Sequence, residues 1–128
     1  MKVRYAIALS TVAGVVIGAA AVQTIHAQGK PPVYAIALNQ LMNADGYSKE
    51  YLPKARPAIA AHGGVYVAAG QGTMVTGDVP HDRVVVLKFE SLDALKAWFN
   101  SPDYQAANKI GQKYAKYNII AVNGVQPK

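Results

Sequence analysis

The residues best suited to catalysis in this sequence are His62 and Tyr104. His62 ends a series spaced by four and three residues, so we expect it on the inner side of a helix, in the last turn. There an imidazole can act as a general base, or it can bond to the free carbonyls of the helix end. Tyr104 follows the helix-start signal "SPD", and we expect its phenol near the mouth of a cavity. Its ring can equally belong to the core.

Four further side chains are candidate ligand contacts: Asn39, Tyr66, Arg83 and Trp98. An arginine at the start of a strand can hold a carboxylate through two parallel hydrogen bonds. Aromatic rings can line an apolar pocket, with an amide or a phenol fixing the ligand's orientation. Each of the four has an ordinary structural alternative, namely a turn for Asn39, a surface ion pair for Arg83 and the core for the two rings.

Metal and cofactor sites have little to build on in this chain. There is no cysteine, and the histidines outside the N-terminal segment are His62 and His81, nineteen residues apart. We therefore expect no metal and no cofactor. The seven carboxylates are dispersed, and no nucleotide fingerprint or serine elbow is present. Lys and Arg are scattered along the chain rather than gathered on one element, so we expect no nucleic-acid partner.

The glycine-rich stretch "AHGGVYVAAGQGT", residues 61–73, raises the question of a phosphate loop. Such a loop runs from a strand into the N-terminus of a helix. Here Gly63 and Gly64 follow a predicted helix, where a left-handed cap favours glycine, and a predicted strand comes next. The later glycines suit strand ends and a turn. The stretch therefore predicts a cap and turns, and no phosphate site.

The apolar patterns predict the elements that must position these residues. The patterns predict strands at 33–40, 65–70 and 117–125, and a nearly continuous apolar run predicts a fourth strand at 84–89. Helices are predicted at 44–62, 92–100 and 102–114. Pro53 and Pro57 predict a kink near Leu52. The order β-α-β-β-α-β indicates an α+β, ferredoxin-like fold, a four-stranded antiparallel sheet with helices on one face.

The other face of that sheet has no predicted helix to cover it. Val84 to Leu87 form a continuous apolar run, which is typical of a strand that is covered on both faces. Burial against a second copy of the chain would cover the exposed side. We therefore expect a homodimer.

The N-terminus has the pattern of an export signal. Lys2 and Arg4 precede an uncharged stretch, and "IHA" before Gln28 resembles a cleavage site. We predict a signal peptide at 1–27, a linker at 28–32, the domain at 33–125 and a tail at 126–128. Cleavage gives a periplasmic protein, and it lowers the net charge from +6 to +4 by removing two of the 13 basic residues, against 7 acidic ones. Retention would anchor the protein in the inner membrane, since about 17 to 25 apolar residues span a bilayer.

Three stretches carry a resemblance to a known family: "YLPKARPAIAAHGGVYVA", "PHDRVVVLKFESLDALKAWFNSPDYQAA" and "VNGV". Over residues 33–125 the chain resembles the domain of unknown function 1330 family, whose members are small dimeric α+β barrel proteins. The resemblance implies that fold and a dimer. The preceding "VQTIHAQGKPPVY" is similar to exported members of the Gram-negative cell envelope. Related members of the superfamily include cofactor-free monooxygenases, haem-binding enzymes and lactone isomerases.

Two functions are compatible with these features. The first is binding of a small apolar or aromatic molecule in a cleft between helices and sheet, with cofactor-free enzymatic activity as its extension. The alternative is a non-catalytic cell-envelope or stress-related binding protein that acts through its dimer face. An enclosed pocket that contains His62 or Tyr104 with a second polar group favours the first, and a filled interior favours the second.

Overall fold

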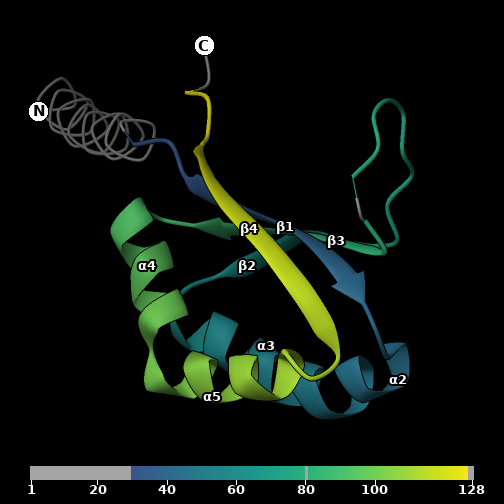
Figure 1. Ribbon diagram of the computed structural model, residues 1–128. Coiled ribbons are helices and arrows are strands. Elements are labelled where there is room, and N and C mark those ends of the chain that lie inside the picture. Colours follow the sequence, from purple (N-terminus) through teal and green to yellow (C-terminus); the bar gives the residue numbers. More distant parts are fainter. Residues whose placement is uncertain (1–29, 80, 127–128) are drawn as a thin grey trace, which may run out of the picture. The chain divides into compact units, whose positions relative to one another are not determined.

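The computed structural model describes residues 30–79 and 81–126 of the chain, and the helices and strands described below lie within Pro32–Gly124 (Figure 1). Its elements follow in the order β1 (Val33–Leu41), α2 (Ala44–Gly46), the π-helical turn η1 (Tyr47–Tyr51), α3 (Leu52–Ala61), β2 (Val65–Gly70), β3 (Arg83–Phe89), α4 (Leu92–Asn100), α5 (Pro102–Gly111) and β4 (Ala115–Asn123). The predicted signal peptide lies outside the described residues. Within the described part, no helix is long and apolar enough to cross a membrane.

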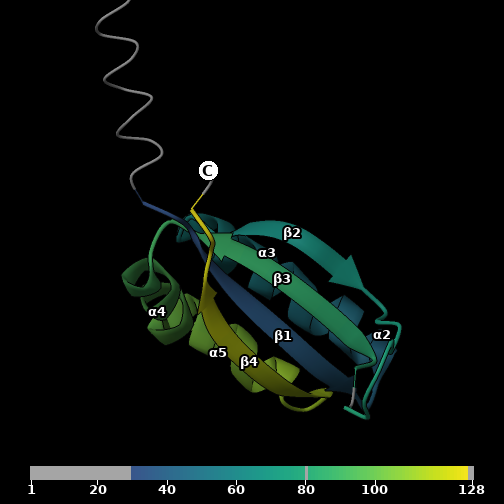
Figure 2. The same ribbon diagram turned by 90° about the horizontal axis from the view of Figure 1, so that it is seen from above.

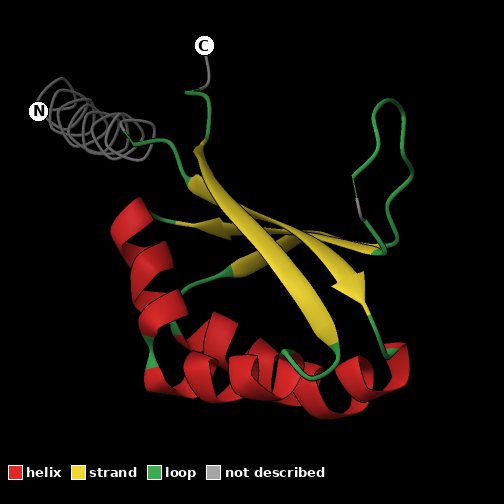
Figure 3. Cartoon of the chain, in the orientation of Figure 1, coloured by secondary structure: helices red, strands yellow, loops and turns green. Residues whose placement is uncertain are grey.

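The four strands form one antiparallel sheet in the order β2-β3-β1-β4 (Figure 1). All the helices lie on the same side of this sheet, as the red and yellow layers of Figure 3 show. The ferredoxin-like arrangement predicted from the sequence is therefore confirmed. Because β1 and β3 are the central strands, the side chains that they point toward the helices form the floor of the interior.

The first helical segment contains the predicted irregularity. Asn43 caps it, with its side-chain oxygen accepting a hydrogen bond from the Gly46 amide at 3.0 Å. The helix then widens into η1, where the Leu52 amide donates to the Tyr47 carbonyl, five residues earlier. Pro53 follows at once and has no amide hydrogen, so a regular helix would lose a bond there. The helix is thus a series of three pieces from 44 to 61 rather than one kinked helix to 62.

The double glycine ends this helix as predicted. Gly63 has a φ of 79°, in the left-handed region. The Gly64 amide donates to the Ile59 carbonyl at 2.9 Å, and the Gly63 amide donates to the Ala60 carbonyl at 3.1 Å. These bonds close the last turn and lead directly into β2.

The last helix is shorter than predicted. It ends at Gly111 rather than near residue 114, because the Tyr114 amide donates to the Gly111 carbonyl at 2.9 Å and so closes a tight turn. The Tyr114 carbonyl in turn accepts bonds from the Met42 and Asn43 amides. As a result β4 begins at Ala115, two residues earlier than expected, and also ends two residues earlier, at Asn123.

The core lies between the helices and one face of the sheet. On β1 the small side chains Val33, Ala35 and Ala37 point toward the helices. Large rings from the helices fill the space that these residues leave, and Trp98 packs against Tyr104 with ring centroids 4.4 Å apart. The floor is apolar along this part of β1, and the buried polar side chain of Asn39 lies toward the other end of the strand.

The second face of the sheet, the open face, carries the larger side chains. β1 places Tyr34, Ile36 and Leu38 there, and the neighbouring strands add the side chains of Val65, Ala68, Val84, Val86, Ile120 and Val122. Ile120 is 62% exposed and Val65 is 54% exposed. Figure 2 views the sheet from this side, with the helices behind it. None of the described helices covers this apolar surface.

Candidate functional site

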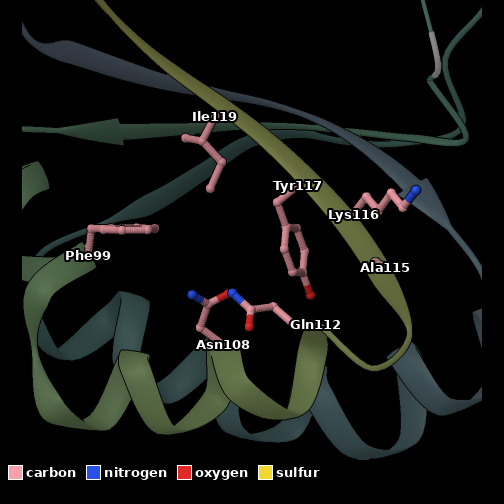
Figure 4. A pocket seen from close by; sticks show the side chains of 7 residues that line it. All are labelled: Phe99, Asn108, Gln112, Ala115, Lys116, Tyr117 and Ile119. Atoms are coloured by element: carbon pink, nitrogen blue, oxygen red, sulfur yellow. The ribbon is translucent and has the colours of Figure 1, made fainter.

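A groove of about 470 Å³ lies between β4 and α5 (Figure 4). Its lining combines amide, phenol, ammonium and apolar groups from Phe99, Asn108, Gln112, Ala115, Lys116, Tyr117 and Ile119. Asn108 on α5 and Gln112, which caps the end of that helix, lie on the helix side of the groove, opposite Tyr117 and Ile119 of β4 (Figure 4). The groove is open to solvent and large enough for a small organic molecule.

A smaller inner cavity of about 30 Å³ lies deeper, between the sheet and the helices. It is lined by Ala37, Asn39, Tyr47, Tyr51, Ile59, Tyr66, Val85, Leu87, Trp98, Tyr117 and Ile119. Tyr117 and Ile119 line both spaces, so these two side chains separate the inner cavity from the groove. The inner cavity alone holds about one or two water molecules. A movement of Tyr117 toward the groove would join the two spaces and make room for a larger ligand.

Three polar side chains form a row across the sheet, on the side that faces the helices. In the strand register Asn39 on β1 lies opposite Arg83 on β3 and opposite Tyr117 on β4. We call Arg83, Asn39 and Tyr117 the polar row. Each has a buried atom without a hydrogen-bond partner among the described residues, namely Arg83 Nε, Asn39 Oδ1 and the Tyr117 hydroxyl. The Trp98 Nε1 is a fourth such atom.

Buried polar atoms without partners are costly. Each one lowers stability by about 1 to 3 kcal/mol relative to a satisfied group. Native proteins contain few of them, and those that persist often belong to functional sites. Asn39 is only 2% exposed, and Trp98 is equally buried, so bulk water does not reach them freely. Four such atoms around one interior space therefore mark this region as the candidate site.

The arginine end of the polar row also contains aromatic rings and a second arginine. The Arg83 guanidinium lies 5.5 Å from the centre of the Tyr47 ring, a cation–π contact. Burial raises the pKa of the Tyr66 phenol, while the nearby charges of Arg56 and Arg83 oppose this rise. Arg83 thus borders the inner cavity beside Tyr47, and the charge of Arg56 acts on Tyr66, which also lines it; neither arginine is part of the lining itself.

Tyr104 lies in the core rather than at a mouth. It is 1% exposed, and its hydroxyl shares a hydrogen bond of 2.8 Å with the Tyr51 hydroxyl. Burial raises the pKa of both phenols, so both stay protonated at neutral pH. Tyr104 is not among the residues that line the groove or the inner cavity, and it reaches the cavity only through Tyr51. Its catalytic role stays a prediction, with Tyr51 as the group that would touch a ligand.

His62 lies at the surface, at the end of α3. Its Nε2 is 3.3 Å from Asp103 Oδ1, and the imidazole is 30% exposed. The hydrogen bond with Ser101 and, less strongly, the one with His62 lower the pKa of the Asp103 carboxyl. His62 lines neither the groove nor the inner cavity, and its neighbour is Asp103 in the first turn of α5. A general-base role for His62 stays a prediction without support from the geometry of the described residues.

The other sequence candidates lie together. Asn39, Tyr66 and Trp98 line the inner cavity, and Arg83 adjoins it through Asn39 and Tyr47. Sequence reasoning missed Tyr117, which completes the polar row. The sequence "YNIIAV" could have indicated this residue, because alternation along a strand puts Tyr117 and Ile119 on the same face of the sheet. It also missed Asn108 and Gln112, which face β4 across the groove. Among the described residues, no group of three metal-ligating side chains is found.

The family is shown by a comparison of the whole domain. A family model for a domain of unknown function, DUF1330, matches residues 32–125. The chain belongs to the DUF1330 family. The resemblance expected from the three sequence stretches is confirmed, and those stretches supply parts of the DUF1330 interior, since Tyr51, Tyr66 and Trp98 lie in the first two.

Solved structures show where this DUF1330 fold recurs. The RPA0582 protein of unknown function from Rhodopseudomonas palustris has a TM-score of 0.65 at 23% identity, over 77% of this chain and 85% of its own. SnoaB, a cofactor-independent oxygenase from Streptomyces nogalater, scores 0.57 at 11% identity, over 76% and 96%. A putative antibiotic biosynthesis monooxygenase from Caulobacter crescentus scores 0.58 at 16%, over 80% and 98%. These likenesses show the fold alone. No curated protein sequence matches the chain.

The buried phenols predict a loss of stability of the DUF1330 domain at alkaline pH. Burial raises the pKa of Tyr104 to about 12, against about 10 in an unfolded chain. A raised pKa stabilises the fold below the unfolded value, and that contribution is lost as pH rises through the folded value. We expect Tyr104 to account for a fall of about 2 to 3 kcal/mol in the free energy of unfolding between pH 10 and about 12.

Urea unfolding measured by far-UV circular dichroism at a series of pH values would test this. The variant Tyr104→Phe lacks the titrating group, so its free energy of unfolding should fall less steeply over the same pH range. An equally steep fall in Tyr104→Phe would contradict the assignment.

A substitution at Gly111 should change the position of Tyr117 in the candidate site. A β-carbon at this position would overlap the Tyr117 hydroxyl and the Tyr51 ring. Gly111→Ala must therefore push Tyr117 away from α5, and we expect it to lower the free energy of unfolding by about 1 to 3 kcal/mol. Gly70→Ala is the matched control, because a β-carbon there meets nothing within 4 Å. Equal melting temperatures for the two variants would show that Tyr117 does not lie over Gly111.

Proposed function

We propose that this protein binds a small, mostly apolar or aromatic molecule between its sheet and its helices. The observation that carries the proposal is a set of four buried, unpartnered polar atoms, of which three belong to residues that line the inner cavity and the fourth belongs to the neighbouring Arg83. Aromatic rings surround them, and the groove beside Tyr117 gives a ligand access. A mostly apolar lining with a few converging polar groups is the usual composition of a ligand site.

The proposal extends to chemistry without a cofactor. SnoaB, whose fold is similar, is described as a cofactor-independent oxygenase. In this chain the buried phenols are held protonated, so they donate hydrogen bonds and do not take protons. Arg83 and the Trp98 indole are also donors. Such a site favours a ligand in its anionic form, and any reaction here would depend on donors that stabilise developing negative charge.

Trp98 provides a direct test of binding, because it is the only tryptophan of the chain and contributes to the inner cavity. A panel of small aromatic compounds should change its emission in a saturable way. Tyr117→Phe removes the buried, unpartnered hydroxyl and keeps the ring, so we expect weaker ligand binding together with a melting temperature that is equal to or higher than that of the unmodified protein. A panel that leaves both the emission and the melting temperature unchanged would contradict the proposal.

We propose that the active form is a periplasmic homodimer joined through the open face. The apolar side chains of β1, β3 and β4 on that face support the dimer. The predicted signal peptide supports export. Native mass spectrometry of protein recovered from the periplasm would report the mature mass and the oligomeric state together. A full-length mass would favour an inner-membrane anchor, and a monomer would contradict the dimer.

The open face also supports the second candidate function, a non-catalytic cell-envelope or stress-related binding protein. The inner cavity of only about 30 Å³, whose lining includes neither His62 nor Tyr104, also fits this second function, and on that view it is a packing defect. The substitution Arg83→Gln is expected to have different effects under the two functions. It should weaken ligand binding in the first case, and it should change neither dimerisation nor envelope function in the second.

A further inference from the structure

Arg56 and Arg83 form a positively charged end of the site that lacks an internal counter-charge. Both guanidinium groups act on the Tyr66 phenol, which lies at the cavity. The ion pairs of the described residues are Lys49 with Asp45 and His62 with Asp103, and neither involves an arginine. Asp82, next to Arg83 in sequence, accepts instead a hydrogen bond from the Leu41 amide at 3.0 Å.

Arg83 is partly buried, which makes the missing partner informative. Its Nε is buried without an acceptor among the described residues, although guanidinium groups in such places are normally paired. The Tyr47 ring offers a cation–π contact, which satisfies the charge in part and leaves the N–H donors free. A guanidinium with free donors matches a carboxylate, which accepts two parallel hydrogen bonds.

We propose that the ligand of this site is an aromatic carboxylic acid, whose carboxylate binds Arg83 and whose ring lies toward Tyr117. This inference rests on the proposed function and names the class of ligand for the same site. Arg56 is exposed and its charge acts on the Tyr66 phenol, so it adds to the attraction of an anion. Asn39 lies between the two ends of the polar row, and its unpartnered Oδ1 accepts only from a donor on the ligand, so Asn39 does not hold the carboxylate.

The dimensions of the polar row set the size of the ligand. Neighbouring strands lie about 5 Å apart, so the backbone distance from Arg83 across Asn39 to Tyr117 is about 10 Å. This length suits a ring joined to a carboxylate by a short chain. The inner cavity is too small for the ring as it stands, but Tyr117 adjoins the groove of about 470 Å³ and has room to move there. The ring of the ligand then takes the place of the Tyr117 phenol, against Trp98.

The test compares an acid with its amide of the same shape. The probes are 3-phenylpropanoate and 3-phenylpropanamide, with benzoate and benzamide as a shorter pair, titrated into the purified protein by calorimetry and by Trp98 emission. We expect 3-phenylpropanoate to bind about 10- to 100-fold more tightly than its amide, which is the range for a charge-assisted hydrogen-bond pair. Arg83→Gln should reduce this preference to about threefold or less.

Two variants separate the specific contact from general charge. Lys109→Gln removes the same charge from an exposed position on α5, and it should keep the preference for the acid. Arg83→Lys keeps the charge but loses the parallel bonds, so the preference should fall about tenfold. This variant also carries the test if Arg83→Gln does not fold, which a melting curve would show.

The outcomes distinguish this inference from the function on which it rests. Equal binding of acid and amide would overturn the inference and leave the proposed function in place. A preference for the acid that survives in Arg83→Gln would also overturn it. If none of the four compounds binds, the inference and the proposed function both fail.

Discussion

Trp98→Ala is expected to lower the free energy of unfolding by about 3 to 5 kcal/mol. Trp98 is 2% exposed, and its ring packs against three other rings, with centroid distances of 5.2 Å to Phe89, 5.9 Å to Phe99 and 4.4 Å to Tyr104. Truncation removes the contacts of all three and leaves a void beside the inner cavity, which the β1 floor of Ala35 and Ala37 cannot fill.

Urea unfolding followed by far-UV circular dichroism would measure this effect, because the variant has no tryptophan to emit. Leu92→Ala is the control on the same helix. Leu92 is 40% exposed, so its truncation should change the free energy of unfolding by about 0.5 kcal/mol or less. If Trp98→Ala unfolded at the same urea concentration as Leu92→Ala, the ring cluster would not be the centre of the core.

Ile36→Lys is expected to convert the proposed dimer into a monomer. Ile36 lies in the middle of the open face, opposite Val86 on β3 and Ile120 on β4. A lysine there would place an unpaired ammonium in a desolvated apolar interface. We expect the dimer dissociation constant to rise by at least about a hundredfold, which corresponds to about 2.8 kcal/mol. The isolated domain should stay folded, because Ile36 points away from the helical core.

Light scattering after size-exclusion chromatography would follow the change in mass. Ala60→Lys is the matched control, since Ala60 is exposed on α3, on the opposite side of the sheet. It should leave the mass unchanged. If the unmodified protein is already a monomer, or if Ile36→Lys keeps the mass of the control, the open face is not the interface.

The order of elements was predictable from sequence because each strand and helix has its own local signal. Asn43, Ser91 and Ser101 accept hydrogen bonds from helix-start amides as their residue types suggest, and Gly63 ends α3 with a positive φ. The alternation of β1 was also visible. Which of its faces carries the helices was not, since the larger side chains turn away from them.

The site was only partly predictable, because it depends on strand register. Asn39, Tyr66 and Trp98 were identified by their chemistry, and they do line one cavity. That Asn39 lies between Arg83 and Tyr117 follows from pairings across three strands, which separate residues by more than 30 positions in the chain. His62 was chosen as a catalytic candidate from its helical spacing alone. That spacing predicts the face of the helix on which a residue lies, but it does not predict which residues of other elements surround the last residue of the helix.

The π-helical turn η1 has a consequence for insertions and deletions in this domain. Such a turn contains one residue more than a regular helix needs, and each helical residue turns the chain by about 100°. Tyr47 and Tyr51 bound this turn and stack with ring centroids 4.9 Å apart, both toward the interior. Removing a single residue such as Ser48 would restore ordinary helical phase and rotate Tyr47 away from Arg83. Homologues with one residue fewer at this point should therefore have a differently shaped interior, even where the remaining sequence is the same.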